Sequence, residues 1–127
     1  GARPQEADAT PVICLENLLT RQELEDDSEA AEVLEDTRDK CAADFGPVAD
    51  ILMVRPMHAG LEDLMGRVLV RFFDKETALK AALSLHGLRF DGRPVRCVFL
   101  TPARFDEVRD RIRSAESAPA PAAEPAA

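Results

Sequence analysis

The sequence predicts an α+β domain: a four-stranded antiparallel sheet with two helices on one face, in the split order βαββαβ. Two observations support this fold class. Four short runs rich in strand formers alternate with two helix-forming segments in that order, and turn or cap residues stand at the junctions. The length of 127 residues suits one such domain with tails. We expect the domain at 11–113, a flexible segment at 1–10, and a disordered tail rich in Ala and Pro at 114–127.

The first three elements follow from local composition. A short apolar run at 12–15 predicts the first strand. The segment 22–44 has helix formers and neither Gly nor Pro, so it predicts the first helix, which Gly46 and Pro47 then end. The run at 48–55 contains consecutive apolar residues and predicts the second strand, after which a loop is expected.

The next three elements repeat the pattern of strand, helix and strand. The alternation within 66–73 predicts the third strand, and Asp74 is a suitable N-cap for a helix over 75–86. An Asp-Gly turn then leads to the last strand at 94–100, where proline is tolerated at the first position.

A further helix is expected after the last strand. Thr101 can cap it, and Pro102 suits its first position. Phe105, Val108 and Ile112 then form an apolar stripe at helical spacing. We therefore expect this C-terminal helix to lie over or beside the sheet face that the other two helices leave open.

The charge balance bears on the class of partner. Acidic residues outnumber basic ones 24 to 16, so the formal net charge is -8. Proteins that bind nucleic acid usually carry a basic surface that neutralises phosphates, so this balance favours a basic partner instead. No apolar run approaches the roughly 20 residues of a membrane span. The start at Gly1 has neither an initiator Met nor a signal peptide, which suggests a piece of a longer protein.

Catalytic and metal-binding constellations are not evident. Cys14, Cys41 and Cys97 are widely spaced and odd in number, which is typical of reduced core thiols in a cytosolic or nuclear protein. His58 and His86 have no zinc-ligand spacing with these cysteines and no nucleophile or base beside them, so we interpret both as incidental. We expect neither an enzyme nor a cofactor.

RNA-binding domains of this plan stack bases on aromatic side chains of the two central strands. The positions where those rings are expected hold Cys14 on the first strand and Arg67 and Leu69 on the third. Phe72 is expected in the core, and the chain has no Trp or Tyr to substitute. The pattern therefore argues against RNA readout by the sheet and favours a sheet whose Cys14 and Leu69 are covered by the C-terminal helix.

The first predicted helix is unusually acidic, with nine acids and two bases between Glu23 and Lys40. At about 100° per residue, one side is predicted to face the core: Ala30, Val33, Leu34, Thr37 and Cys41. The opposite side carries a row of carboxylates, namely Glu25, Glu29, Glu32, Asp36 and Asp39. Such a row is usually a solvated surface, but its density keeps open a role in attracting a basic ligand.

Several stretches together resemble the U2 auxiliary factor homology motif, a variant of the RNA-recognition motif. They are 15–18, 23–27 and 35–41, and 66–72, 88–90 and 104–105 are also similar. The resemblance covers about residues 11–110, and within the family it is to the C-terminal domain of the large subunits of that splicing factor.

The resemblance implies a nuclear protein-interaction module of pre-mRNA splicing that does not read RNA through its sheet. Members of this family bind a short motif in which basic residues precede a tryptophan. Known ligands of the family include the branch-point-binding protein and the largest subunit of splicing factor three b. The ring enters a pocket between the acidic helix and an Arg-X-Phe loop. The residues implied for this pocket and its rim are Leu88, Arg89, Phe90, Arg93, Glu29, Glu32, Val33, Asp36 and Lys40.

Two positions depart from the family pattern together. Leu88 stands where the family has the Arg of Arg-X-Phe, and Lys40 stands where it has an acid that pairs with that Arg. The guanidinium that would lie against the ligand ring is therefore missing, a contact worth about 0.5–2 kcal/mol. Arg89 and Arg93 are candidates to replace it.

Two other functions stay open at the level of sequence. The domain could bind RNA through its loops, its tails or Arg67 and Arg71. It could also be a degenerate member of the family that serves as a dimerisation or scaffold element. Binding of a basic tryptophan peptide, compared with binding of a pyrimidine-rich oligonucleotide, separates these functions.

Overall fold

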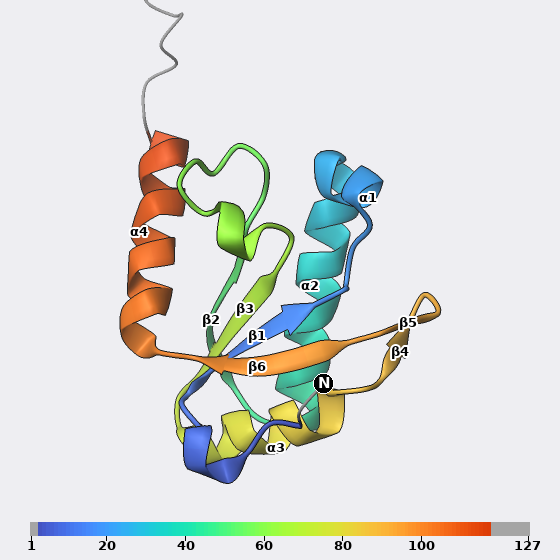
Figure 1. Cartoon of the computed structure of the whole chain (residues 1–127), viewed down its shortest axis with the longest axis vertical. Helices are drawn as coiled ribbons and strands as arrows, with labels where there is room; N and C mark the ends of the chain where they lie inside the picture. The colour runs from blue at the N-terminus through green and yellow to red at the C-terminus, as the bar shows by residue number, and fades with distance from the viewer. Residues whose placement is uncertain (1–2, 118–127) are drawn as a thin grey trace, which may run out of the picture.

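A computed structural model describes residues 3–117 and shows the predicted α+β arrangement (Figure 1). The antiparallel sheet has four strands in the order β2-β3-β1-β6. These strands are β1 (Val12–Glu16), β2 (Val48–Met53), β3 (Val68–Phe72) and β6 (Arg96–Leu100). The α-helices are α1 (Arg21–Glu25), α2 (Asp27–Asp44), α3 (Lys75–Leu85) and α4 (Pro102–Ser117). The predicted βαββαβ order and the additional C-terminal helix are thus confirmed.

The central strand β1 pairs with two strands that lie far from it in sequence. Cys14 is opposite Leu69 of β3 on one side and opposite Val98 of β6 on the other. Since successive side chains of a strand point to opposite faces, Cys14 belongs to one face of the sheet, and Ile13 and Leu15 belong to the other. This alternation separates the two apolar layers of the domain.

The single helix predicted over 22–44 is in fact two helices. α1 ends at Glu25, and Asp26 takes an extended conformation with φ −97° and ψ 116° before α2 begins. The Asp26 carboxylate accepts a hydrogen bond from the backbone N–H of Glu29 at 3.0 Å and so caps α2. The prediction failed because an Asp can end one helix by capping the next, without any Gly or Pro. Glu25 therefore does not continue the acidic row of α2.

The starts of the later helices follow the sequence as predicted. The Asp74 carboxylate accepts a hydrogen bond from the backbone N–H of Thr77 at 2.7 Å, and this bond lowers the pKa of Asp74. The Thr101 hydroxyl accepts one from the backbone N–H of Arg104 at 3.1 Å. Both caps satisfy backbone donors that a helix start leaves without a partner.

A short hairpin that the sequence analysis did not predict stands between α3 and β6. Its strands are β4 (Arg89–Phe90) and β5 (Arg93–Pro94). The linking residues Asp91 and Gly92 have φ of 54° and 78°, as a two-residue type I′ turn requires. The last strand, expected at 94–100, is therefore divided. Val95 lies between β5 and β6 and donates its backbone N–H to the Leu88 carbonyl at 2.7 Å.

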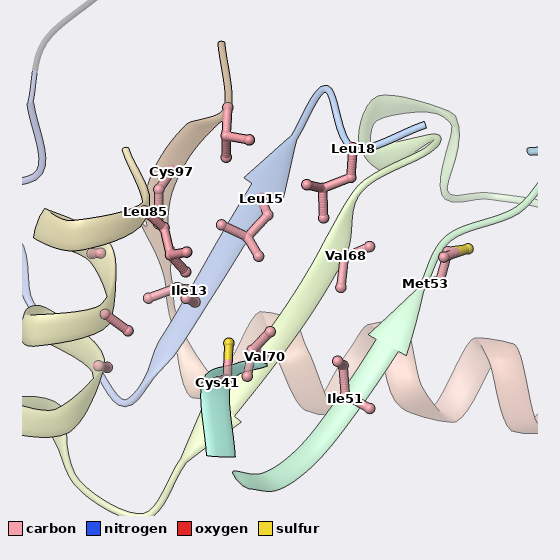
Figure 2. Close-up of a cluster of buried hydrophobic side chains, with 14 of the residues drawn as sticks. Ile13, Leu15, Leu18, Cys41, Ile51, Met53, Val68, Val70, Leu85 and Cys97 are labelled. Carbon is pink, nitrogen blue, oxygen red and sulfur yellow. The ribbon is translucent and has the colours of Figure 1, made fainter. Parts of the chain in front are cut away.

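Helices α2 and α3 pack on one face of the sheet and enclose the larger apolar cluster (Figure 2). Ile13 and Leu15 of β1 point into this layer, and Cys41 is the most deeply buried residue of α2, at 1% exposure. Phe72 is also buried there, as predicted. Val33 packs against the cluster and stays partly exposed, so α2 leaves apolar surface at its margin.

The opposite face of the sheet is covered by α4, as its apolar stripe predicted (Figure 1). Phe105 and Val108 are fully buried in one cluster with Cys14 and Leu69. Ile112 extends the same cluster toward the end of the helix. Two of the three positions that hold stacking rings in RNA-binding domains of this plan, Cys14 and Leu69, are therefore closed to solvent, and the third, Arg67, stays partly exposed.

Charged contacts hold α4 in place at its N-terminal half. Arg104 donates two hydrogen bonds to the Asp63 carboxylate, at 3.0 and 3.1 Å. Arg71 of β3 pairs with Asp106 at 3.0 Å, and its guanidinium lies 5.5 Å from the centre of the Phe105 ring. These contacts fix the helix to both the loop before β3 and the sheet itself.

The two ends of the domain differ from expectation in detail. α4 runs to Ser117, so the prediction of a disordered tail is wrong for 114–117, and 118–127 lie outside the described residues. At the other end, Glu6–Asp8 form a 3-10 turn, and the Thr10 hydroxyl donates to the Leu100 carbonyl at 2.6 Å. Within the described part of the chain, no helix is long and apolar enough to span a membrane.

Candidate binding site between the acidic helix and the hairpin

An apolar cavity of about 190 Å³ opens between α2 and the β4–β5 hairpin. Its floor is formed by Leu15, Leu18, Leu85 and Val95, all of which are at most 7% exposed. A pocket for a whole small molecule usually measures roughly 300–1,000 Å³, so this one suits a single inserted side chain. The apolar floor selects for a side chain that gains by leaving water.

One wall of the cavity is a stripe of α2. Val33 and Cys41 are its apolar part, and the hydroxyl of Thr37 between them already has a partner, because it donates to the Val33 carbonyl at 2.7 Å. Burial raises the pKa of the Cys41 thiol to about 11, so this group is neutral at physiological pH. Asp36 and Lys40 stand at the rim of the same wall.

The Lys40 ammonium is paired along the helix. Its Nζ lies 2.8 Å from a carboxylate oxygen of Asp44, one turn further on, and the two side chains are 51% and 48% exposed. Lys40 thus lines the cavity while its ammonium is paired with a neighbour on the same helix. An exposed pair of this kind stabilises a helix by about 0.3–0.5 kcal/mol.

The other wall is the hairpin. Leu88 and Phe90 are 44% and 38% exposed, although both are large apolar side chains. The hairpin is tied to the end of β1, because the Asn17 amide donates to the Pro94 carbonyl at 3.0 Å and Arg93 donates to the Asn17 carbonyl at 3.3 Å. The exposed apolar wall is therefore presented on a fixed support.

The structure brings most of the predicted site residues together. The six that line the cavity are Val33, Asp36, Lys40, Leu88, Arg89 and Phe90. Glu29, Glu32 and Arg93 do not line it. Glu32 is one turn before Asp36 but projects further around the helix, and Arg93 is directed to Asn17.

Sequence reasoning missed most of the floor. Leu15 could have been found, because the strand alternation puts it on the same face as Ile13. Leu18 follows β1, Leu85 is the last residue of α3 and Val95 lies between β5 and β6, and nothing local in the sequence indicates that they meet.

The two histidines are structural rather than incidental. His58 is 6% exposed, its Nδ1 accepts a hydrogen bond from the backbone N–H of Arg55 at 3.0 Å, and burial lowers its pKa. His86 Nδ1 accepts one from the backbone N–H of Cys97 at 3.0 Å. Among residues 3–117, no group of histidines, cysteines and acids is arranged to hold a metal ion. All three cysteines are free and buried, as predicted.

The arginines on the covered face of the sheet are paired with carboxylates. Arg67 lies 3.7 Å from a carboxylate oxygen of Glu16, and Arg71 pairs with Asp106 of α4. Cys14 and Leu69 are fully buried beneath α4. The sheet therefore presents neither rings nor unpaired guanidinium groups to a nucleic acid, and the cavity beside α2 is the better candidate for recognition.

No family model matches the chain. It is 34% identical over 97 residues to a splicing factor U2af large subunit of Oryza sativa subsp. japonica, and 34% identical over 100 residues to one from Nicotiana plumbaginifolia. These alignments cover 76% and 78% of the chain but only 18% of each relative, so the chain corresponds to a small part of those proteins.

A solved structure supports the fold independently. The structure of the RNA15 RRM matches with a TM-score of 0.51 at 18% sequence identity, and the match covers 77% of this chain and 98% of that one. At this identity the likeness concerns the fold alone.

Proposed function

This chain is an RRM-type domain homologous to one segment of the U2af large subunits, and from that premise we propose that it is a protein-interaction module of pre-mRNA splicing. In this proposal, the cavity between α2 and the hairpin takes up the side chain of a tryptophan from a partner's peptide. Basic residues that precede the tryptophan face α2. Because pre-mRNA splicing takes place in the nucleus, we also propose a nuclear location.

The observation that carries this proposal is the cavity itself. Leu88 and Phe90 remain exposed directly above a floor of buried leucine and valine side chains. Exposed apolar groups gathered at a hollow are typical of binding surfaces. A ring inserted there would contact Phe90 on one side and Val33 and Thr37 on the other. Buried aromatic anchors of this kind are common hot spots of protein interfaces, worth about 2–4 kcal/mol.

The charge on α2 supports a basic ligand. Asp36 lies at the rim, and Glu29, Glu32 and Asp39 stand on the same helix beyond it. Charges are screened over about 8 Å at physiological salt, so Asp36 acts on residues next to the inserted ring and the others act at longer range. Such charges mainly raise the association rate and disfavour acidic competitors.

We propose that the partner is a splicing-factor segment in which Lys and Arg precede a Trp. The family resemblance makes the branch-point-binding protein and the largest subunit of splicing factor three b the first candidates. RNA binding by this domain is expected to be weak, because α4 closes the sheet face on which bases would stack. An affinity no better than the non-specific level of about 10⁻⁴ M is expected for a single strand.

Calorimetric titration of the chain tests the proposal. The probes are a synthetic peptide with three basic residues before one tryptophan, the same peptide with alanine in place of the tryptophan, and a pyrimidine-rich oligoribonucleotide. We expect binding of the first peptide only. Equal binding of both peptides would reduce the interaction to charge alone. Tight binding of the oligonucleotide with no binding of the peptides would favour RNA recognition outside the covered sheet.

A further inference from the structure

We propose that Lys40 determines the specificity of this cavity: its ammonium lies against the face of the inserted ring, so that the site prefers electron-rich aromatic side chains over apolar ones of similar size. This inference rests on the proposed function, because it concerns the side chain that enters the cavity.

The cavity has two cationic side chains in its lining, Lys40 and Arg89, on opposite walls. All its remaining lining residues are apolar apart from Asp36 and Thr37. A cation held against the face of an aromatic ring is attracted by the negative charge of the π system, most strongly when the contact is shielded from water. Either cation could make this contact, and the two differ in the direction of their side chains and in their present hydrogen-bond partners.

The hairpin geometry disfavours Arg89. Arg89 lines the cavity, but successive side chains of a strand point to opposite faces, so the end of its side chain is directed away from Leu88 and Phe90. Its guanidinium also donates to the Gly92 carbonyl at 2.9 Å, across the type I′ turn. Turning it toward the ring would break this bond at the tip of the hairpin.

Lys40 does not have the first obstacle, and the bond that it would give up is an exposed pair with Asp44. It is on α2, in the stripe with Val33 and Thr37 that forms the wall facing Phe90. Its partner Asp44 is about half exposed, as Lys40 is, so water screens the pair and its exchange for another partner costs little. A lysine has a flexible four-carbon stem, and this stem can stay packed at the cavity while the ammonium turns from Asp44 to the ring.

If Lys40 contacts the ring, the cavity prefers side chains whose rings carry more π-electron density. Attraction to a cation is strongest for the indole of Trp and weaker for the rings of Tyr and Phe, while Leu or Met gains nothing from it. Without such a cation, this cavity would rank ligands by size and apolar area alone. Lys40 would thus restore aromatic selectivity to a site whose hairpin has leucine at position 88.

A series of peptides with fluorinated tryptophans tests the role of Lys40. Each added fluorine withdraws electrons from the ring while changing its shape little, so a cation–ring contact weakens stepwise. We expect the affinity of the parent chain to fall steadily along the series, by roughly three- to tenfold from tryptophan to the most fluorinated ring. In Lys40→Met, which keeps the stem and removes the charge, the affinity should be lower for tryptophan and flat along the series.

Arg89→Met is the matched control, because it removes the other cation of the lining by the same substitution. It should keep the downward trend of the parent, whatever it does to the overall affinity. A flat trend in the parent, or a trend that survives in Lys40→Met and disappears in Arg89→Met, would overturn the assignment to Lys40 while leaving peptide binding intact. Failure of every peptide to bind would overturn both this inference and the proposed function.

Discussion

Both faces of the sheet carry apolar side chains. One face is covered by α4, and the other leaves some apolar surface beside it exposed. On one face, α4 buries Phe105 and Val108 completely against Cys14 and Leu69. On the other, α2 and α3 cover most of the sheet but leave open the cavity beside the hairpin, called the hollow below, where Phe90 stays 38% exposed. The covered face is also tied down by ion pairs through Arg71 and Arg104, whereas nothing in the described residues closes the hollow.

This difference indicates which side of the domain can bind a partner. The face that binds bases in RNA-recognition motifs has become internal, and its side chains now contribute to stability. The hollow has the opposite property, because Leu88 and Phe90 of its hairpin wall stay exposed and offer apolar surface to a partner. Substitutions on the two sides should therefore separate stability from binding.

The largest effect is expected from Phe105→Ala on the covered face. The side chain is fully buried, so its removal should lower the free energy of unfolding by about 3–5 kcal/mol. Urea unfolding followed by circular dichroism measures this change. Peptide affinity, measured where the variant is still folded, should stay close to that of the parent. A loss of less than about 1 kcal/mol would mean that α4 is not an integral part of the fold.

Phe90→Ala should show the reverse pattern. Because Phe90 is partly exposed and forms one wall of the hollow, its removal should weaken peptide binding by about 2 kcal/mol or more, while the free energy of unfolding changes by less than about 1 kcal/mol. The same titration and urea experiment measure both quantities. An unchanged affinity in the folded variant would contradict the placement of the ring beside the hairpin.

The acidic helix offers a finer comparison between two neighbouring carboxylates. Asp36 lines the hollow and Glu32 does not, although both belong to the same row. Asp36→Asn should slow association with the basic peptide by a few-fold and reduce its salt dependence, and Glu32→Gln should do so less. Stopped-flow association at two salt concentrations distinguishes them. Equal rates for both variants and the parent would identify the row as a solvated surface without a role in binding.

The smallest effect concerns pH and belongs to the covered side, where His58 lies near the end of α4. Burial lowers the pKa of His58 below its ordinary value of 6.5. Between the two pKa values the unfolded chain binds more protons than the folded one, so the free energy of unfolding should fall as the pH drops below 6.5 and level off below the folded-state pKa.

His58→Asn provides the control for this pH dependence. Its side-chain oxygen can still accept the hydrogen bond from the backbone N–H of Arg55, but it does not titrate. Urea unfolding from about pH 8 to about pH 5 should show a shallower decline in this variant than in the parent. Identical declines would assign the pH dependence to other groups.

The elements that the sequence predicted best are those set by neighbouring residues. Asp74 and Thr101 cap their helices through bonds that span three residues, so composition alone locates them. The cover over the sheet was also predictable, because the spacing of Phe105, Val108 and Ile112 matches one helix face. The break at Asp26 was missed since the same residue type serves equally well inside an acidic surface and at a cap.

The candidate site was predicted less completely, for a physical reason. Its hairpin wall and its α2 wall were identified, but the floor requires Leu18, which follows β1, to meet Leu85 and Val95 much later in the chain. The difference between Asp36 and Glu32 depends on how far α2 is rotated about its axis, and the acidic row itself does not fix this rotation. Peptide binding at this site remains a prediction.

The strand order also constrains how the domain is made. Among the four strands of the sheet β1 is synthesised first, but its two partners, β3 and β6, are synthesised much later, and β6 comes last. Contacts between segments so distant in sequence form slowly, because a long loop must close before any of them is gained. A nascent chain that stops before β6 has α2, its acid row and the hairpin, but β1 lacks one of its two neighbours in the sheet. Translation must therefore pass Leu100 before the sheet beneath the hollow is complete, and shorter products leave apolar strands exposed.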